Sequence, residues 1–178
     1  MNRKLKLDEL NRVSVEEFKA QRKLPIIVVL DNIRSLNNIG SFFRTSDAFN
    51  IEAVYLCGIT AQPPHREIQK TALGSTESVA WEYFDTTENA LIKLRELAYT
   101  VYAIEQTETP IYLQEFKYNK EKVALVFGNE VDGVGQNVIN LSKNSIEIPQ
   151  FGTKHSLNVS ISSGIVLWHL ANQTLKGQ

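Results

Sequence analysis

The chain alternates short aliphatic runs with segments in which apolar residues recur every three or four positions. Residues 25–32 (PIIVVLDN) contain five consecutive aliphatic residues, and residues 123–127 (VALVF) form a second apolar run. A strand without polar alternation needs cover on both faces, which a parallel sheet between two layers of helices provides. The pattern therefore predicts an α/β fold, in which a mainly parallel sheet is flanked by helices.

The same pattern gives the order of the expected elements. Ser14 and Glu17 form a capping-box pair at the start of the first helix, and Pro25 ends that helix. Residues 78–84 alternate in the way that is typical of an exposed or edge strand. Strands are expected at residues 25–32, 53–58, 78–84, 101–105, 123–127 and 145–149. Helices are expected at residues 15–22, 38–50, 67–73, 87–99, 136–141 and 157–175.

Length and composition favour one domain. A chain of 178 residues, 43% of them hydrophobic, buries a sizeable core without disulfides or metal. We find no internal repeat, and expect a basic helical arm at residues 1–24 followed by a single domain at residues 25–178. No aliphatic run is long enough to span a bilayer, and Cys57, the only cysteine, fits a buried strand thiol. We therefore expect a soluble, cytoplasmic protein that makes no membrane contact.

The overall charge does not indicate a nucleic-acid partner. The net charge is −1 and the isoelectric point is about 6.3, whereas nucleic-acid-binding domains are typically basic. The distribution is uneven, because residues 1–24 hold seven basic and four acidic residues, a net charge of +3, which leaves −4 for the rest. This arm fits either a phosphate-binding segment or a solvated amphipathic helix.

Three loops, each following an expected strand, are rich in small and amide residues. They cover residues 37–47, 127–135 and 148–160. Open parallel sheets bind ligands beyond the carboxyl ends of their strands, where such loops converge. Glycine and asparagine are also ordinary turn residues, so one of these loops alone would indicate no more than turn structure.

Together and in this order, the three loops resemble the three motifs of the SpoU (TrmH-like) family of RNA 2'-O-ribose methyltransferases, within the SPOUT superfamily. The resemblance runs from about Ile26 to the end of the chain. It departs from the family at Gln150, where methionine is frequent, and in the arm, which lies outside the shared region. The matching positions are Asn38, Gly40 and Arg44 in the first motif, Phe127, Gly128, Asn129 and Glu130 in the second, and Ile148, Pro149, Gly152, Ser156, Leu157 and Asn158 in the third.

The resemblance implies a C-terminal deep trefoil knot, in which the last strand and helix thread through an earlier loop and form the donor pocket. It also implies a homodimer that packs through the first and last helices. The implied reaction is the transfer of a methyl group from S-adenosylmethionine to a ribose 2'-hydroxyl in RNA. We favour tRNA over rRNA as substrate, because the chain lacks the extra N-terminal RNA-binding domain of some relatives. A non-catalytic RNA-binding knotted module and a nucleotide-binding α/β protein unrelated to RNA are the alternatives.

The resemblance also assigns roles to the catalytic candidates. Arg44 would act on the 2'-hydroxyl, either as the general base or by clamping the neighbouring phosphate, the second role being easier for a guanidinium that stays protonated. Asn38 and Glu130 would hold Arg44, and Ser156 and Asn158 would orient the ribose or the arginine. Each of these four residues also fits a capping or turn role.

Two further groups of residues are implied by the resemblance. The expected contacts to S-adenosylmethionine are Gly128, Ile148 and Leu157, with Ile104, Glu105 and Gln106 flanking the pocket. The expected RNA-facing residues are His65, Arg66 and Lys70, although a solvated loop explains them almost as well. The histidines are scattered and form no metal-ligand pattern with the one cysteine, so we expect no metal site.

Overall fold

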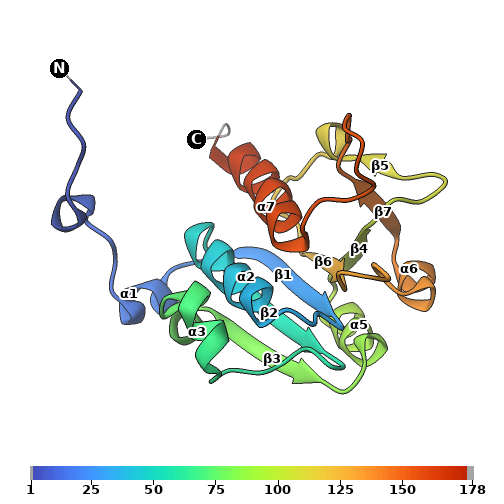
Figure 1. The fold of residues 1–178 in the computed structure, drawn as a ribbon, viewed down its shortest axis with the longest axis horizontal. Coiled ribbons are helices and arrows are strands. Elements are labelled where there is room, and N and C mark those ends of the chain that lie inside the picture. The colour runs from blue at the N-terminus through green and yellow to red at the C-terminus, as the bar shows by residue number, and fades with distance from the viewer. Residues whose placement is uncertain (1, 176–178) are drawn as a thin grey trace.

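The computed structural model describes residues 2–175 and confirms the α/β class. Seven strands form one sheet in the order β3-β2-β1-β6-β4-β7-β5, and every neighbouring pair is parallel (Figure 1). The strands are β1 (Leu24–Asp31), β2 (Ile51–Cys57), β3 (Ala80–Phe84), β4 (Thr100–Ile104), β5 (Ile111–Tyr112), β6 (Val123–Gly128) and β7 (Asn144–Glu147). All their carboxyl ends therefore lie along one edge of the sheet.

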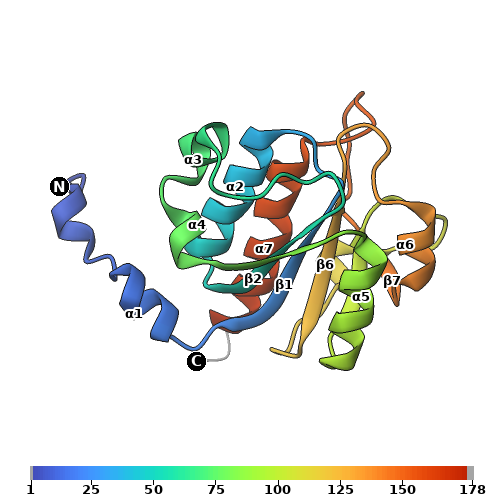
Figure 2. The same cartoon turned by 90° about the horizontal axis from the view of Figure 1, so that it is seen from below.

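Helices cover both faces of the sheet, as the unbroken apolar strands require (Figure 2). On one face lie α2 (Leu36–Ala48), α3 (Arg66–Ala72), α4 (Ser75–Ser78) and α7 (Val159–Leu175). On the other lie α5 (Thr87–Glu96) and α6 (Gln136–Leu141). Strand β1 serves both layers, because Val28 packs into the core beneath α2 and α7 while Ile27 and Val29 pack into the core beneath α5.

The expected elements are present, with shifted ends, and the structure adds the 3₁₀-helices at Leu7–Leu10 and Leu113–Glu115, the short helix α4 and the strand β5. The first helix ends at Ala20 and the last helix begins at Val159. The edge strand begins at Ala80, because the residues before it form α4 instead of continuing the alternation. The added strand β5 has two residues and lies at the opposite edge of the sheet.

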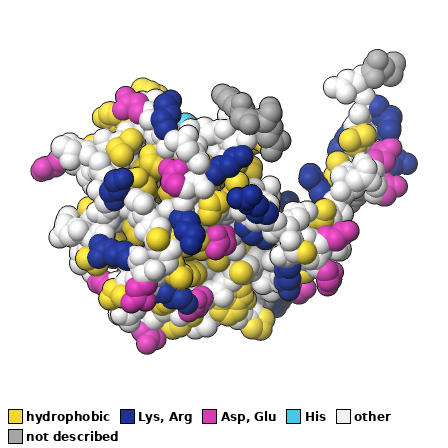
Figure 3. All heavy atoms as spheres, turned by 180° about the vertical axis from the view of Figure 1, so that it is seen from behind, with side chains coloured by type: hydrophobic (Ala, Val, Ile, Leu, Met, Phe, Trp, Pro, Cys, Tyr) yellow, Lys and Arg dark blue, Asp and Glu magenta, His cyan; other side chains and the backbone are white. Residues whose placement is uncertain are grey.

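The N-terminal segment has two parts. The side chain of Ser14 accepts a hydrogen bond from the backbone of Glu17, so the predicted capping box starts α1 (Val15–Ala20), and Phe18 of that helix is buried in the core. The residues before it, including the 3₁₀-helix η1 (Leu7–Leu10), extend away from the body (Figures 1 and 2). Figure 3 shows basic, acidic and hydrophobic side chains mixed along this extension. The division into residues 1–24 and 25–178 remains a prediction, and residues 1 and 176–178 of it lie outside the described part of the chain.

Cys57 lies at the end of β2 and is fully buried, as predicted. Its burial raises the pKa of the thiol to about 12. The hydrogen bond with Thr87 lowers the pKa, but by less than burial raises it. The thiol is therefore protonated and unreactive at neutral pH. Within residues 2–175, no helix combines the length and the hydrophobicity that crossing a membrane would need.

Candidate functional site

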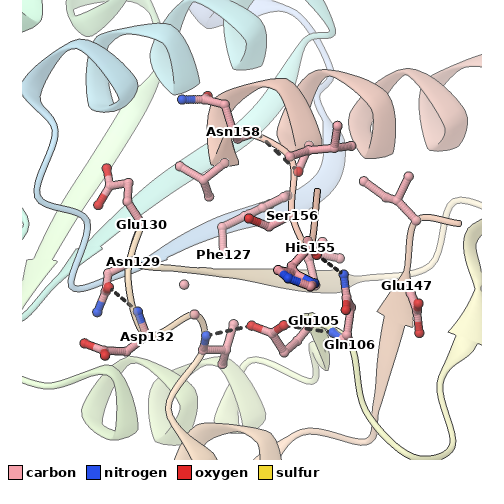
Figure 4. A pocket seen from close by; sticks show the side chains of 18 of the residues that line it. Glu105, Gln106, Phe127, Asn129, Glu130, Asp132, Glu147, His155, Ser156 and Asn158 are labelled. Carbon is pink, nitrogen blue, oxygen red and sulfur yellow. Dashed lines mark hydrogen bonds between the residues drawn. The ribbon is translucent and has the colours of Figure 1, made fainter. Parts of the chain in front are cut away.

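A cavity of about 730 Å³ lies at the carboxyl ends of β4, β6 and β7 (Figure 4). Three segments form its walls: the residues after β4, the loop after β6 and the long loop between β7 and α7. All six residues expected to contact the methyl donor line it, namely Ile104, Glu105, Gln106, Gly128, Ile148 and Leu157. The cavity therefore lies where open parallel sheets bind ligands, and residues of the second and third motifs meet there.

Gly128 allows the loop after β6 to fold back on itself. A Cβ atom at this position would lie 2.0 Å from the backbone carbon of Gly133 and 2.0 Å from the amide nitrogen of Val134. No other residue type fits without moving the backbone. Gly133 is in the left-handed region at φ +68°, and Asn129 and Gly133 exchange backbone hydrogen bonds, so the loop is a tight reversal.

Glu105 fastens this loop to the end of β4. One of its carboxylate oxygens accepts a hydrogen bond from the amide of Val134 at 2.9 Å, and the other accepts one from Gln106 at 2.8 Å. The carboxylate also fills the space beside Gly133 that a Cβ would occupy. Glu105 was expected to flank the pocket, and the structure shows that its carboxylate fixes the pocket wall.

The side chain of Gln106 connects the segment after β4 to the long loop that precedes α7. Its amide donates a hydrogen bond to the backbone carbonyl of His155 at 2.8 Å (Figure 4). Ser156 and Leu157 follow directly and line the cavity. The third motif is thereby held against the same cavity as the second.

Glu130 joins the first and second motifs. Its carboxylate accepts hydrogen bonds from the backbone amides of Arg34 at 3.1 Å and Ser35 at 3.0 Å, and from the side-chain amide of Asn38 at 2.8 Å. Asn38 also accepts a hydrogen bond from the side chain of Asn158 at 3.3 Å. One residue of each motif therefore takes part in a continuous chain of contacts at the edge of the cavity.

These contacts determine the charge state of Glu130. Burial alone would raise the pKa of its carboxyl group, but the hydrogen bonds from Asn38 and from the amides of Arg34 and Ser35 together lower it below the usual value. Glu130 is therefore a carboxylate at neutral pH. Hydrogen bonding to the charged form is the physical cause of the shift.

Arg44 lies apart from this cluster. It is on the exposed side of α2, six positions after Asn38, which corresponds to a rise of about 9 Å along the helix. Within residues 2–175 it forms no ion pair with Glu130, whose hydrogen-bond donors are Arg34, Ser35 and Asn38. The expectation that Asn38 and Glu130 hold Arg44 is thus not met in the single chain, and the role of Arg44 remains a prediction.

The three expected RNA-facing residues lie together around α3. His65 caps this helix, its ring nitrogen accepting a hydrogen bond from the amide of Glu67, and Arg66 is the first helical residue. Lys70 forms an ion pair with Glu67 at 2.8 Å, so part of its charge is already compensated. All three expected residues are exposed, and none of them lines the cavity.

Sequence reasoning missed several charged residues of the site. Asp132 and Glu147 line the cavity together with Glu105 and Glu130, and no lysine or arginine is among the described residues that line it. Asp31, at the end of β1, is buried and accepts hydrogen bonds from Thr87 and from the amide of Gly135, so it fastens the far end of the loop after β6. For Asp31, the sequence did carry a signal, because an acidic residue stands at the very end of a buried strand.

The lining is chemically suited to a cationic ligand. It combines four carboxylates with apolar side chains such as Ile148 and Leu157 and with the backbone of the loop after β6. Among the residues that the structure describes, no group of three or more histidine, cysteine, aspartate or glutamate side chains is arranged to hold a metal ion.

Comparison with known proteins agrees with this geometry. The family model described as "SpoU rRNA Methylase family" matches residues 25–168. A tRNA (guanosine(18)-2'-O)-methyltransferase of Thermus thermophilus is 30% identical over 168 residues, which cover 94% of this chain and 85% of that protein.

Two solved structures share the fold. The TrmH/SpoU tRNA modifying enzyme of A. aeolicus superposes with a TM-score of 0.80 and 25% identity, over 92% of this chain and 83% of that chain. The AdoMet-bound rRNA methyltransferase of Sinorhizobium meliloti superposes with a TM-score of 0.76 and 27% identity, over 86% of this chain and 61% of that chain. With residues of the second and third motifs lining one cavity, Asn38 of the first motif hydrogen-bonded to them, and the family model matching most of its length, the chain belongs to the SpoU rRNA methylase family.

Proposed function

We propose that the protein transfers a methyl group from S-adenosylmethionine to a ribose 2'-hydroxyl of RNA. One observation carries the proposal: the six expected donor contacts and three of the expected catalytic residues, Glu130, Ser156 and Asn158, line the same cavity. Asn38 is hydrogen-bonded to two of these three. The activities named for the relatives, on tRNA and on rRNA, are in keeping with it.

The cavity fits the donor in size and charge. Its volume of about 730 Å³ is within the range of sites for small molecules, which is roughly 300–1,000 Å³. S-adenosylmethionine carries a sulfonium and an ammonium group against one carboxylate, so an acidic lining complements it. When bound, the donor supplies an electrophilic methyl group to the acceptor oxygen.

The chain's own residues would position the acceptor and fix the loops around it. Ser156 is exposed at the cavity and its hydroxyl makes no hydrogen bond within the described residues, so it is available to the ribose. Asn158 is held through Asn38, which is 8% exposed. Alignment of donor and acceptor is the main contribution expected of such groups, because it removes the entropy cost of their encounter.

Glu130 serves as an organiser and is a poor general base. Its carboxylate already accepts three hydrogen bonds, and its lowered pKa weakens it as a proton acceptor at neutral pH. The proton of the 2'-hydroxyl would go to water or to an RNA phosphate as the oxygen–methyl bond forms. Arg44, exposed on α2, would lower the pKa of that hydroxyl electrostatically. The alternative is that Arg44 acts as the general base, and the pH profile of methyl transfer by Arg44 variants distinguishes the two roles.

The test is incubation of the full chain with radiolabelled S-adenosylmethionine and either total tRNA or ribosomal RNA, followed by nuclease digestion to identify 2'-O-methylnucleosides. We expect label in the tRNA pool, and label in rRNA alone would assign the alternative substrate. Donor binding without transfer to either pool would favour the non-catalytic RNA-binding module. Binding of ATP or NAD in place of S-adenosylmethionine would refute the proposal. We place this activity in the cytoplasm, which cell fractionation tests.

We also propose that the protein is a homodimer. Ile161, Ile165 and Trp168 are exposed at helical spacing on one face of α7, with 56%, 38% and 51% of their surfaces accessible. An apolar stripe of this kind is typical of an interface, and the family resemblance makes a second copy the occupant. Light scattering should give the dimer mass, and Ile165→Glu should shift it toward the monomer while Ile92→Glu on α5, also exposed, should not.

A deep trefoil knot is our proposal for the C-terminal part. It is supported by the strand order, because β7 lies between β4 and β5 although both precede it in the sequence. The connection from β4 to β5 at residues 105–110 has to pass the position of β7 in the sheet, and Gln106 at its start is hydrogen-bonded to His155 of the chain that leaves β7. A crystal structure in which the chain after β7 passes outside this connection would refute the knot.

We retain the division into an arm at residues 1–24 and a catalytic domain at residues 25–178 as a proposal. It is supported by the extension of the first residues away from the body, with Leu5 and Val13 54% and 48% exposed. Since Phe18 is buried in the core, a deletion should end before α1. Removal of residues 1–13 should leave the thermal unfolding temperature unchanged within about 2 °C, a shift of less than roughly 1 kcal/mol. A larger fall would assign these residues to the domain.

A further inference from the structure

Arg34 is fixed beside the catalytic cluster by its own backbone. It lies in the loop after β1, and its amide donates a hydrogen bond to the carboxylate of Glu130 at 3.1 Å. Its side chain is 57% exposed. Its one ion pair within the described residues is with Asp132, at the limiting distance of 4.0 Å. The side chain is thus held near the cavity but remains available for another partner.

The negative charges that line the cavity make a nearby cation necessary for binding RNA. The cavity is lined by four carboxylates and by no lysine or arginine among the described residues. That lining suits a cationic donor, but the RNA that brings the ribose also brings a phosphate on each side of it. These phosphates are repelled by exposed carboxylates such as that of Asp132, unless a nearby cation compensates.

Two other cations near the site are less suited to this task. Arg44 lies farther along α2 and, among the described residues, forms no hydrogen bond or ion pair with Glu130. Lys154 is exposed on the loop before α7 and, like Arg34, does not line the cavity, but among the described residues it has no hydrogen bond to the catalytic cluster. Arg34 differs from both because its backbone is bonded to the catalytic cluster and its side chain adjoins an acid that lines the cavity.

We propose that Arg34 binds a phosphate next to the acceptor ribose and exchanges its loose contact with Asp132 for that phosphate. A planar guanidinium binds two phosphate oxygens at once, which fixes the register of the RNA as well as holding it. No covalent step is involved. The inference rests on the proposed function, since it requires that RNA enters this cavity.

The experiment measures RNA binding against salt concentration for the full chain, with total tRNA or ribosomal RNA as probe, whichever pool accepts methyl groups from the wild type. Arg34→Ala should raise the dissociation constant for RNA about tenfold and reduce the slope of log affinity against log salt by about 1. Arg34→Lys should recover part of the affinity but not all of it, because it keeps the charge and loses the fork.

Two further variants serve as controls. Arg95→Ala removes an exposed arginine on α5, on the opposite face of the sheet, and should leave the affinity and the slope unchanged. Asp132→Asn releases Arg34 from its ion pair and should keep or increase the affinity for RNA. Circular dichroism should show a folded Arg34→Ala protein, because the bond to Glu130 comes from the backbone.

The outcomes separate this inference from the function it rests on. If the wild type methylates RNA but Arg34→Ala behaves like Arg95→Ala, the phosphate contact is refuted and the enzyme stands. A weaker binding of S-adenosylmethionine by Arg34→Ala, with an unchanged salt slope, would instead make Arg34 a donor contact and would also refute the proposal. A wild type that binds no donor and transfers no methyl group would refute the proposed function itself.

Discussion

Substitution of Gly128 by alanine should deform the cavity at one defined place. The added Cβ would lie 2.0 Å from backbone atoms of both Gly133 and Val134, whereas atoms in ordinary contact are about 3.5 Å apart. The two segments must therefore separate by about 1.5 Å. Because Val134 donates a 2.9 Å hydrogen bond to Glu105, that separation also breaks the bond that fastens the cavity wall to β4.

The cost follows from these two effects. Forcing an extra methyl group into packed structure costs about 1–3 kcal/mol, and losing a hydrogen bond to a charged group costs about 1.5–3 kcal/mol. We expect a loss of about 4 kcal/mol in the free energy of unfolding. For a domain of this size, that corresponds to a fall of about 10 °C in Tm. The affinity for S-adenosylmethionine should fall at least about tenfold, because the displaced backbone forms part of the proposed donor site.

Calorimetric unfolding and titration with S-adenosylmethionine measure both quantities. Gly152→Ala is the matched control, since Gly152 is a motif glycine in the loop between β7 and α7, is not among the residues that line the cavity, and has no atom within 4 Å of the position of its Cβ. It should change Tm by no more than about 1 °C, as expected for an exposed substitution. If Gly128→Ala had the stability and donor affinity of this control, the assigned backbone contact would be wrong.

Three further predictions concern individual side chains. Arg44→Ala should abolish methyl transfer and leave the dissociation constant for S-adenosylmethionine unchanged in a binding titration, and surviving activity would remove Arg44 from the mechanism. Leu157→Asp places a charge at the cavity wall and should weaken donor binding by at least about tenfold, with some loss of Tm. Glu130→Gln should lower Tm at pH 7. Since the pKa of Glu130 is lowered in the folded state, its stabilising effect is present above the unfolded value of about 4.3 and is lost as the pH falls through the folded value. The Tm difference from the wild type should therefore shrink toward pH 3, and a constant difference would contradict the assignment.

The fold was predictable to the extent that periodicity carries it. Residues such as Ile27 and Val28 belong to an unbroken aliphatic run, and their alternate burial in two cores is what such a run indicates. Helix α4 and strand β5 were missed because four polar residues and a pair of residues are too short to show any period. The placement of β7 between β4 and β5 leaves no trace in local sequence, since it depends on pairing between distant segments.

The site was predictable as a set of residues, through the motifs, but its contacts were not. Glu130 and Asn38 were expected to cooperate, yet their bond joins positions 92 residues apart and is supplemented by backbone amides that no side-chain pattern encodes. The sequence did not indicate Arg34 for the same reason, because the residue is bound to Glu130 through a main-chain hydrogen bond. For Arg44 the motif identified the residue but not its surroundings, since a motif position does not determine where a single chain places its side chain.

The four carboxylates of the cavity divide by their hydrogen bonds into two kinds. Glu105 and Glu130 accept bonds from backbone amides on loops other than their own, so their charges are compensated and their role is to fasten those loops. Within the described residues, the side-chain carboxylate of Glu147 accepts no hydrogen bond, and that of Asp132 has only the loose contact with Arg34. These two acids keep their charge available to the cavity. It follows that the negative potential offered to a cationic donor comes mainly from Asp132 and Glu147. Removal of Glu105 or Glu130 should instead act on donor binding through the geometry of the loops.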